Sequence, residues 1–294
     1  MGLRHAVIGA GNLGLDIATL LRQQSYEVEV FSKVSQFKYP CSIETLLDYR
    51  PDHVWVAVGA GSIGEAQKNY APFADLHIRL VIELAQKLPP NVTLHTFSTD
   101  FLLDGPPKSL YALSKLHMEE TLKMMNRPNT FIYRVGYLYG SWKPQKCFPY
   151  ELKRRNPRPT TLTIPSNRVV PTPTDWVAKQ LVHWLSDSGC EAPTILNIFP
   201  NGTVPRYEWA QKILGDRYTI AAGDLDATRP DHNDSLGCDL ALAKNTPSWE
   251  DLWNEHSNAW TVICGNVEKG LEHGHIRKPG IRSGEYPKKR VSIG

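Results

Sequence analysis

A hydroxyl, a phenol and an ammonium group lie close together in one short stretch, STDFLLDGPPKSLYALSK, from Ser98 to Lys115. Tyr111 and Lys115 are four residues apart, so on a helix they share one face. An ammonium near a phenol favours the phenolate and lowers its pKa from about 10, which would make Tyr111 a usable acid near neutral pH. Thr99 ends the preceding apolar run and could donate a hydrogen bond to a carbonyl oxygen. This set of groups predicts protonation of a ketone oxygen during hydride transfer.

A glycine-rich turn near the N-terminus supplies a place for the hydride carrier. The turn follows the apolar run AVI and fits G-x-G-x-x-G, with a helical pattern beginning at Leu13. In such turns the first glycine allows the tight bend, the second lets the backbone approach a pyrophosphate, and the third lets helix pack on strand. The pattern therefore predicts cofactor contacts at Gly9, Gly11, Asn12, Leu13 and Gly14.

The end of the second predicted strand indicates which dinucleotide binds. An NAD site usually places an acid there, but this strand ends VFSK. Ser32 and Lys33 could bind a 2′-phosphate, which favours NADP, while NAD stays open because Glu29 lies within the strand. The next apolar strand, HVWVAVGAG, ends in three further predicted cofactor contacts: Gly59, Ala60 and Gly61.

Strand and helix patterns alternate through the first half of the chain, which predicts an α/β fold with a doubly wound parallel Rossmann sheet. The composition changes after Gly140: residues 141–174 are rich in proline and basic side chains. We expect this stretch to form an irregular lid or substrate-facing segment. We predict a dinucleotide-binding domain over 1–143, with 172–190 packing back on it. A smaller C-terminal α/β substrate domain would span 144–256, and a basic tail 257–294.

Composition and charge narrow the class of protein. The 294 residues are 41% hydrophobic and 21% charged, as in ordinary globular chains. A net charge of +3 does not indicate a nucleic-acid partner, and no apolar run approaches the roughly 18 residues that a membrane span needs. The five cysteines are far apart, odd in number and form no C-x-x-C pair, so we expect neither disulfides nor a metal site. These features predict a cytoplasmic protein.

Several stretches resemble the extended short-chain dehydrogenase/reductase superfamily, and within it the dTDP-4-dehydrorhamnose reductase branch. STDFLLDG is similar to that branch's strand-end motif, and YALSKLHMEE to its Tyr-Gly-x-Ser-Lys-x-x-x-Glu. YRVGYLYG resembles its Arg-Thr-Ser-Trp-Leu-Tyr-Gly, and NRVVPTPTDWVAKQL its Gly-x-Pro-Thr-x-x-x-Asp-Leu-Ala. The likeness runs from about residue 5 to residue 254 and does not include the tail.

The resemblance implies a Rossmann domain, a smaller domain for a nucleotide-linked sugar, and reduction of a 4-keto-6-deoxy sugar at C4 with NADP or NAD. Residue-by-residue matching makes Thr99, Tyr111 and Lys115 the catalytic set. The superfamily also often forms homodimers. The same matching implies these substrate contacts: Ser98, Asp100, Tyr137 and Arg229.

The sequence also departs from the branch it resembles. Its glycine turn is one residue shorter, and Tyr137 stands where the branch usually has Trp. Only twelve residues separate Thr99 from Tyr111, where the branch has a longer acidic, proline-rich loop that contacts substrate. These departures indicate a more open site or a different substrate.

Two alternatives to a reductase stay open. An epimerase or 4,6-dehydratase on the same fold would need a further acid–base pair near Thr99, but Asp100 and Phe101 follow instead of Asp-Glu. A non-catalytic NADP-binding regulatory subunit, similar to the methionine adenosyltransferase β subunit, would suit the short loop and the basic tail. Retention of Thr99, Tyr111 and Lys115 favours an enzyme.

A basic stretch follows the Leu-Tyr-Gly strand end. We hypothesise that some of its side chains meet the diphosphate of a sugar nucleotide, because ligands of open α/β sheets lie on that side. A solvated basic helix explains the same residues equally well. The side chains concerned are Lys143, Lys146, Lys153, Arg154, Arg155 and Arg158.

Overall fold

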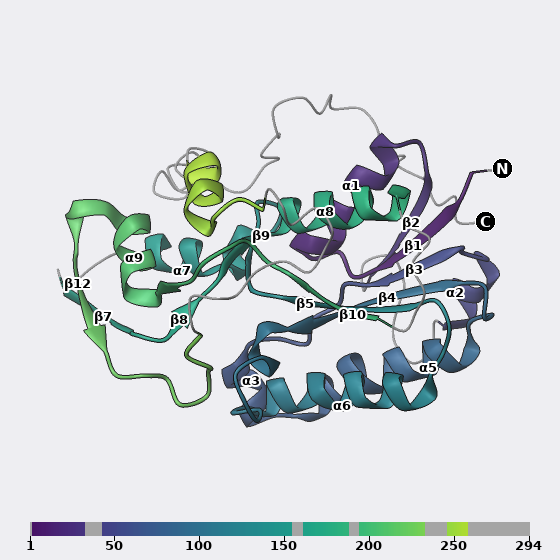
Figure 1. The fold of residues 1–294 in the computed structure, drawn as a ribbon, viewed down its shortest axis with the longest axis horizontal. Coiled ribbons are helices and arrows are strands. Elements are labelled where there is room, and N and C mark those ends of the chain that lie inside the picture. Colours follow the sequence, from purple (N-terminus) through teal and green to yellow (C-terminus); the bar gives the residue numbers. More distant parts are fainter. Residues whose placement is uncertain (1, 33–42, 155–160, 188–193, 233–245, 258–294) are drawn as a thin grey trace, which may run out of the picture.

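The centre of the protein is a six-stranded sheet in which every neighbouring pair is parallel, in the order β10-β5-β4-β3-β1-β2 (Figure 1). The computed structural model describes residues 2–32, 43–154, 161–187, 194–232 and 246–257. The sheet strands are β1 (Arg4–Ile8), β2 (Glu27–Phe31), β3 (His53–Val56), β4 (Thr93–Thr99), β5 (Thr130–Val135) and β10 (Thr194–Ile198).

Helices cover both faces of this sheet, with α1 and α8 on one face and α5 and α6 on the other (Figure 1). Successive strand residues point to opposite faces, so Trp55 packs under α1 and α8 while Val56 packs on the other side. The predicted α/β Rossmann fold is confirmed. The helices are α1 (Asn12–Gln23), α2 (Ile43–Asp48), α3 (Ile63–Lys68), α5 (Leu80–Lys87), α6 (Leu110–Met125) and α8 (Thr174–Asp187).

The helix before β4 differs from its prediction. The pattern over residues 74–88 predicts one α-helix, but the chain forms the short α4 (Ala71–Phe73), a π-helical turn η2 (Ala74–Arg79) and then α5. Phe73 and His77 are both buried and pack edge-on against Tyr111. Helix α4 and the π-helical turn thus each bring one aromatic side chain to α6, and π-helical turns of this kind are frequent at functional sites.

The segment after Gly140 is more regular than expected. Three two-stranded pairs, β6 with β9, β7 with β12 and β8 with β11, join helices α7 and α9 around a separate apolar cluster. A further helix covers residues 249–257. The elements are β6 (Tyr137–Tyr139), α7 (Phe148–Arg154), β7 (Thr161–Pro165), β8 (Arg168–Val169), β9 (Pro171–Pro173), β11 (Val204–Pro205), α9 (Arg206–Leu214) and β12 (Thr219–Gly223), with 3-10 turns η3 (Asp100–Leu102), η4 (Pro144–Lys146) and η5 (Gly215–Arg217).

The separate cluster supports a domain boundary near residue 143, which stays a prediction. Helix α8 packs against α1 on the central sheet, although it follows β9 in the chain. In the part of the chain that the structure describes, no helix combines the length and the apolar character that crossing a bilayer requires. The predicted tail, residues 257–294, lies almost wholly outside the described residues.

Candidate active site

The glycine turn lies where the strand order reverses, because the chain passes from β1 outward to β2 and then returns across β1 to β3. Ligands of open α/β sheets bind at such a point. Gly9 has a φ of +111°, and a Cβ there would lie 2.5 Å from the Ala57 carbonyl oxygen of the neighbouring strand end. A Cβ on Gly14 would lie 2.0 Å from the Gly9 carbonyl oxygen. Both positions therefore need glycine to bring turn, strand and helix together.

Gly11 differs from these two glycines because it faces open space. No heavy atom lies within 4 Å of a Cβ placed there. Gly11 is also the N-cap of α1, and no side chain caps that helix end. The free backbone N–H groups of a helix N-terminus attract phosphate. The turn thus suits a dinucleotide pyrophosphate, and the cofactor contacts of its residues stay a prediction.

Asn12 is predicted to contact the cofactor, but its side chain is hydrogen-bonded to other parts of the protein. Its amide donates to the Lys143 carbonyl oxygen at 3.2 Å and to Cys147 Sγ at 3.3 Å, and its Oδ1 accepts from the Lys143 backbone N–H at 2.6 Å. These bonds tie the glycine turn to the start of the C-terminal part. The neighbouring Leu13 is buried in the core below α1.

The other predicted cofactor positions surround the same turn. Gly59 and Gly61 are exposed after β3, and a Cβ on Gly59 would meet nothing within 4 Å. Ala60 and Ser32 are half-buried, with Ser32 directly after β2. Lys33 lies outside the described residues, so its role as a 2′-phosphate ligand stays a prediction.

Thr99 and Tyr111 come together at the carboxyl end of β4. Ser109 caps α6 by accepting from the Ala112 N–H at 3.2 Å, which begins the helix just before Tyr111. The phenol lies close enough to Thr99 for that hydroxyl to lower its pKa, and the Thr99 hydroxyl donates to Asp100 Oδ1 at 3.0 Å. Phenol, hydroxyl and carboxylate are therefore neighbours at this strand end.

The pKa of Tyr111 moves in the direction opposite to the prediction. Burial, followed by the nearby Asp100 charge, raises it to about 12, against smaller lowering effects of Thr99 and Arg229. Lys115 does not supply the expected effect because its Nζ donates to the Phe97 carbonyl oxygen at 2.7 Å. Burial also lowers the pKa of Lys115 to about 7, so much of its charge is lost near neutral pH.

A buried histidine borders the same phenol. His77, in the π-helical turn, lies edge-on to the Tyr111 ring at 5.6 Å between centroids, and its Nδ1 lies 2.9 Å from Ser114 Oγ. Burial and then the Lys115 charge lower its pKa to about 2, so the imidazole is neutral. It therefore acts as an apolar and hydrogen-bonding wall behind Tyr111.

Two arginines frame the opposite side of the site. Arg229 lies over the rings of Tyr137 at 5.3 Å and Phe101 at 5.7 Å, while its Nε donates to Asp226 at 3.2 Å. Arg206, at the start of α9, lies 6.0 Å from the centre of the same Tyr137 ring. Its Nε is buried and, among the described residues, has no hydrogen-bond partner. An unpaired buried donor of this kind suits an anionic ligand.

The remaining predicted substrate residues are buried at the end of β4. Ser98 is 2% exposed, and its hydroxyl has no hydrogen-bond partner among the described residues. Asp100 is also 2% exposed and lies 2.9 Å from His232 Nε2 through its Oδ2. Ser98 therefore lies in the wall of the site, whereas Asp100 accepts from the Thr99 hydroxyl.

Sequence reasoning missed His77, Arg206 and His232. A signal existed for His232, which follows Arg229 by three positions in a segment already matched to the family. His77 offered no signal, because a lone histidine in a helical pattern is usually an ordinary packed residue. Arg206 begins a helix that was predicted, but only the tertiary fold places it beside Tyr137.

The basic stretch after β6 lies nearer the glycine turn than expected. The Lys143 backbone binds Asn12, and Lys146 lies close enough to Glu65, at the start of α3, to lower its pKa after the larger effect of Ser62. Their contact with a sugar diphosphate stays a hypothesis, as does that of Lys153 and Arg154. Arg155 and Arg158 lie outside the described residues.

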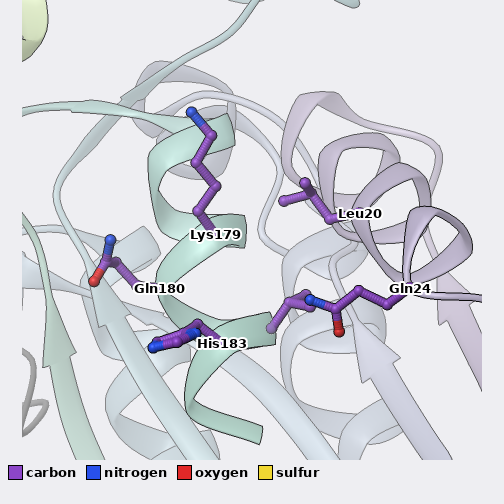
Figure 2. A pocket seen from close by; sticks show the side chains of 6 residues that line it. Leu20, Gln24, Lys179, Gln180 and His183 are labelled. Carbon is purple, nitrogen blue, oxygen red and sulfur yellow. The ribbon is translucent and has the colours of Figure 1, made fainter. Parts of the chain in front are cut away.

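An open pocket of about 420 Å³ lies elsewhere, between the last turns of α1 and the middle of α8 (Figure 2). Leu20 and Gln24 line it from α1, at the end of that helix away from the glycine turn. Its remaining lining comes from α8: Lys179, Gln180, Val182 and His183. The pocket is therefore separate from Thr99 and Tyr111.

The sheet order and the glycine turn at its switch point define a Rossmann-type protein of the dinucleotide-binding class. A family model described as RmlD substrate binding domain matches residues 6–230, and the chain belongs to this family. No curated protein sequence matches the chain.

Solved structures give the same result at the level of the fold. The dTDP-4-dehydrorhamnose reductase of Clostridium acetobutylicum superposes with a TM-score of 0.74 at 17% identity, over 88% of this chain and 100% of that one. The Bacillus anthracis enzyme of that name, solved with NADP, gives 0.72 at 16% identity over 89% and 99%. UDP-glucose 4-epimerase of Thermus thermophilus, solved with NAD, gives 0.63 at 16% identity over 90% and 99%.

Proposed function

We propose that the protein is an NADPH-dependent reductase of a nucleotide-linked 4-keto-6-deoxy sugar, with NAD(H) as the other cofactor candidate. The observation that carries this proposal is that Tyr111 and Thr99 meet at the end of β4, beside the strand whose end lies against the glycine turn. The solved relatives that bind NADP or NAD support the choice of cofactor. Reduction of a ketone needs a proton donor and a hydroxyl that can bind the carbonyl oxygen, and Tyr111 and Thr99 could supply both.

The chain's own residues would handle the ketone oxygen. The cofactor supplies the hydride when bound. Tyr111 donates its proton to the oxygen, so that hydride and proton together convert the ketone to an alcohol. Because the Thr99 hydroxyl has a single proton and donates it to Asp100, it must turn from Asp100 to donate to the carbonyl.

The arginine pair supports a substrate that carries phosphate. Arg206 and Arg229 face one ring, Tyr137, and both lie near the carboxylate of Asp226. Two guanidinium groups around one carboxylate leave a positive charge to be balanced, and guanidinium binds phosphate well. A nucleotide diphosphate would supply that balance.

Turnover tests the proposal. We expect the protein to oxidise NADPH in the presence of one member of a panel of dTDP-, GDP- and UDP-linked 4-keto sugars. Tyr111→Phe should lower kcat by about 100-fold or more, because general acid catalysis contributes that much. Tyr218→Phe, a half-buried tyrosine beyond α9, is the matched control and should keep full activity. Equal rates for Tyr111→Phe and the parent would refute the assignment.

A second candidate is a non-catalytic NADP-binding regulatory subunit. One observation favours it: Lys115 is bound to the Phe97 carbonyl and does not lower the pKa of Tyr111. NADPH binding without oxidation by any sugar in the panel would support this candidate. Epimerase or dehydratase activity would appear instead as product formed without net loss of NADPH.

A further inference from the structure

A buried histidine connects the C-terminal part of the chain to the catalytic strand end. His232 is 2% exposed and lies in the segment that follows β12. Its Nε2 lies 2.9 Å from Asp100 Oδ2, and its Nδ1 is hydrogen-bonded to the carboxylate of Asp104. Asp100 and Asp104 belong to the turn that directly follows Thr99.

Hydrogen-bond counting fixes the protonation of this cluster. A neutral imidazole has one N–H, whereas each ring nitrogen of His232 faces a carboxylate oxygen, which can only accept. An imidazolium donates to both carboxylates at once. Burial lowers the pKa of His232, but the hydrogen bonds and charges of Asp100 and Asp104 outweigh burial and raise it above its ordinary value.

The cluster reaches Tyr111 through Asp100. The second oxygen of that carboxylate accepts from Thr99, and its charge raises the pKa of Tyr111. An imidazolium on Asp100 therefore has two effects. It fixes the carboxylate beside Thr99, and it weakens the carboxylate's hold on the Thr99 proton, which must be released to bind a carbonyl.

We propose that His232 is a positioning residue for the reduction, acting as an imidazolium that holds Asp100 beside Thr99 and offsets its charge next to Tyr111. This inference rests on the proposed reductase function. The same contact anchors the segment that carries Arg229, so the arginine side of the site and the phenol side are joined through one ring.

The other charged groups around His232 have their own partners. In its own segment, Arg229 is paired with Asp226, and Asp231 accepts from the Arg168 backbone N–H at 2.8 Å. From α6, Tyr111 faces Asp100. The two carboxylates in direct contact with His232 therefore dominate its protonation.

Histidine NMR tests the imidazolium without any activity. In protein labelled at histidine Cε1, the His232 resonance is identified by its loss in His232→Gln. We expect it to titrate above pH 6.5, and Asp104→Asn should lower its pKa because one carboxylate is removed. Titration at or below pH 6.5 in the folded parent protein would overturn the inference.

Kinetics test the positioning role. We expect kcat to fall at least tenfold in His232→Gln with little change in the KM for NADPH. The activity of the parent should fall as pH rises through the pKa of His232. In Asp104→Asn this fall should occur at lower pH, and in His232→Gln it should be absent. Identical pH profiles in all three folded proteins would overturn the positioning role. A parent that reduces no sugar would refute the reductase function together with that role, while the NMR titration would still decide the imidazolium.

Discussion

Gly9 and Gly11 stand two positions apart in the same turn but have opposite surroundings. Gly9→Ala places a Cβ 2.5 Å from the Ala57 carbonyl at a φ of +111°, so we expect a loss of about 1–3 kcal/mol in the free energy of unfolding. Gly11→Ala meets nothing within 4 Å and should fold normally. Its methyl group points into the space proposed for pyrophosphate, so NADPH should bind about tenfold more weakly, a loss of ~1.4 kcal/mol.

Urea unfolding and NADPH fluorescence titration separate the two glycine effects. Gly64→Ala is the matched control for added volume, because its Cβ would also meet nothing within 4 Å but lies on α3. Unchanged NADPH affinity in Gly11→Ala would contradict a pyrophosphate on this turn.

Lys115 should make stability depend on pH. Its pKa is about 7 in the folded protein against an ordinary value of 10.5, so between those pH values the unfolded chain binds more protons and stability rises with pH. Lys115→Met removes the buried charge. We expect a gain of a few kcal/mol at pH 6, relative to the parent, that shrinks toward pH 10.

Urea unfolding at several pH values measures the Lys115 effect. Lys123→Met, on the exposed side of the same helix, is the control and should show a difference from the parent that does not change with pH in this way. A Lys115→Met protein less stable than the parent at pH 6 would show that the Phe97 hydrogen bond outweighs the cost of burying the charge.

At the scale of elements, neighbouring strands of the sheet carry a row of buried imidazoles. His5 on β1, His53 on β3 and His95 on β4 stack in sequence, and His95 also bonds the Tyr133 hydroxyl at 2.8 Å. Burial is the largest cause that lowers their pKa values, to about 3 for His5, about 4 for His53 and well below the ordinary value for His95. All three are therefore neutral in the folded sheet.

This row predicts acid lability. Unfolded histidines take up protons near pH 6.5, whereas these three do not while folded, so stability is lost as pH falls from 6.5 toward 4. His53→Phe keeps an aromatic ring in the stack and should reduce the slope of unfolding free energy against pH by about 1.4 kcal/mol per unit. His117→Asn, exposed on α6, should leave the slope unchanged. Equal slopes for His53→Phe and the parent, measured by urea unfolding, would contradict the prediction.

Elements with strong periodicity were predictable from the sequence, and elements defined by partners were not. The six sheet strands are rich in apolar residues, which alternate with glutamates in β2, and α1, α6, α8 and α9 repeat apolar residues at helical spacing. Strands β6, β8, β9 and β11 are three residues long or shorter, and two of them, β9 and β11, contain proline. Such strands exist only because distant segments pair with them, as β6 does with β9.

The residues of the candidate site also fall into those predictable from local spacing and those placed only by tertiary packing. Thr99 and Tyr111 were found because they lie within one segment, and the structure places them close enough for Thr99 to lower the pKa of Tyr111. The orientation of Lys115 was not predictable, because helical spacing fixes which face a side chain occupies but not whether its end meets a phenol or a backbone carbonyl. His232 and Arg206 come from more than 90 residues further along the chain, and only tertiary packing places them.

At the scale of the whole molecule, Asp16 joins the two parts of the chain. It is buried on α1, where it accepts from the Trp142 indole at 2.8 Å and from the Thr174 hydroxyl at 2.6 Å. Trp142 lies at the predicted domain boundary and Thr174 begins α8. The Asp16 carboxylate therefore ties two later segments of the chain to α1. Hydrogen bonds to a charged group stabilise by about 1.5–3 kcal/mol each.

Asp16→Ala should therefore cost about 3 kcal/mol or more of unfolding free energy, because it removes the acceptor of the half-buried Trp142 indole and of the buried Thr174 hydroxyl. It should also weaken NADPH binding, since the segment after Trp142 holds Asn12 beside the glycine turn. Asp16→Asn keeps one carbonyl acceptor and should recover part of the stability, while Asp48→Ala, exposed on α2, should change neither quantity. Thermal unfolding with and without NADPH gives both readings. A stable Asp16→Ala protein with full NADPH affinity would mean that the paired strands and the α1–α8 packing hold the two parts together without this carboxylate.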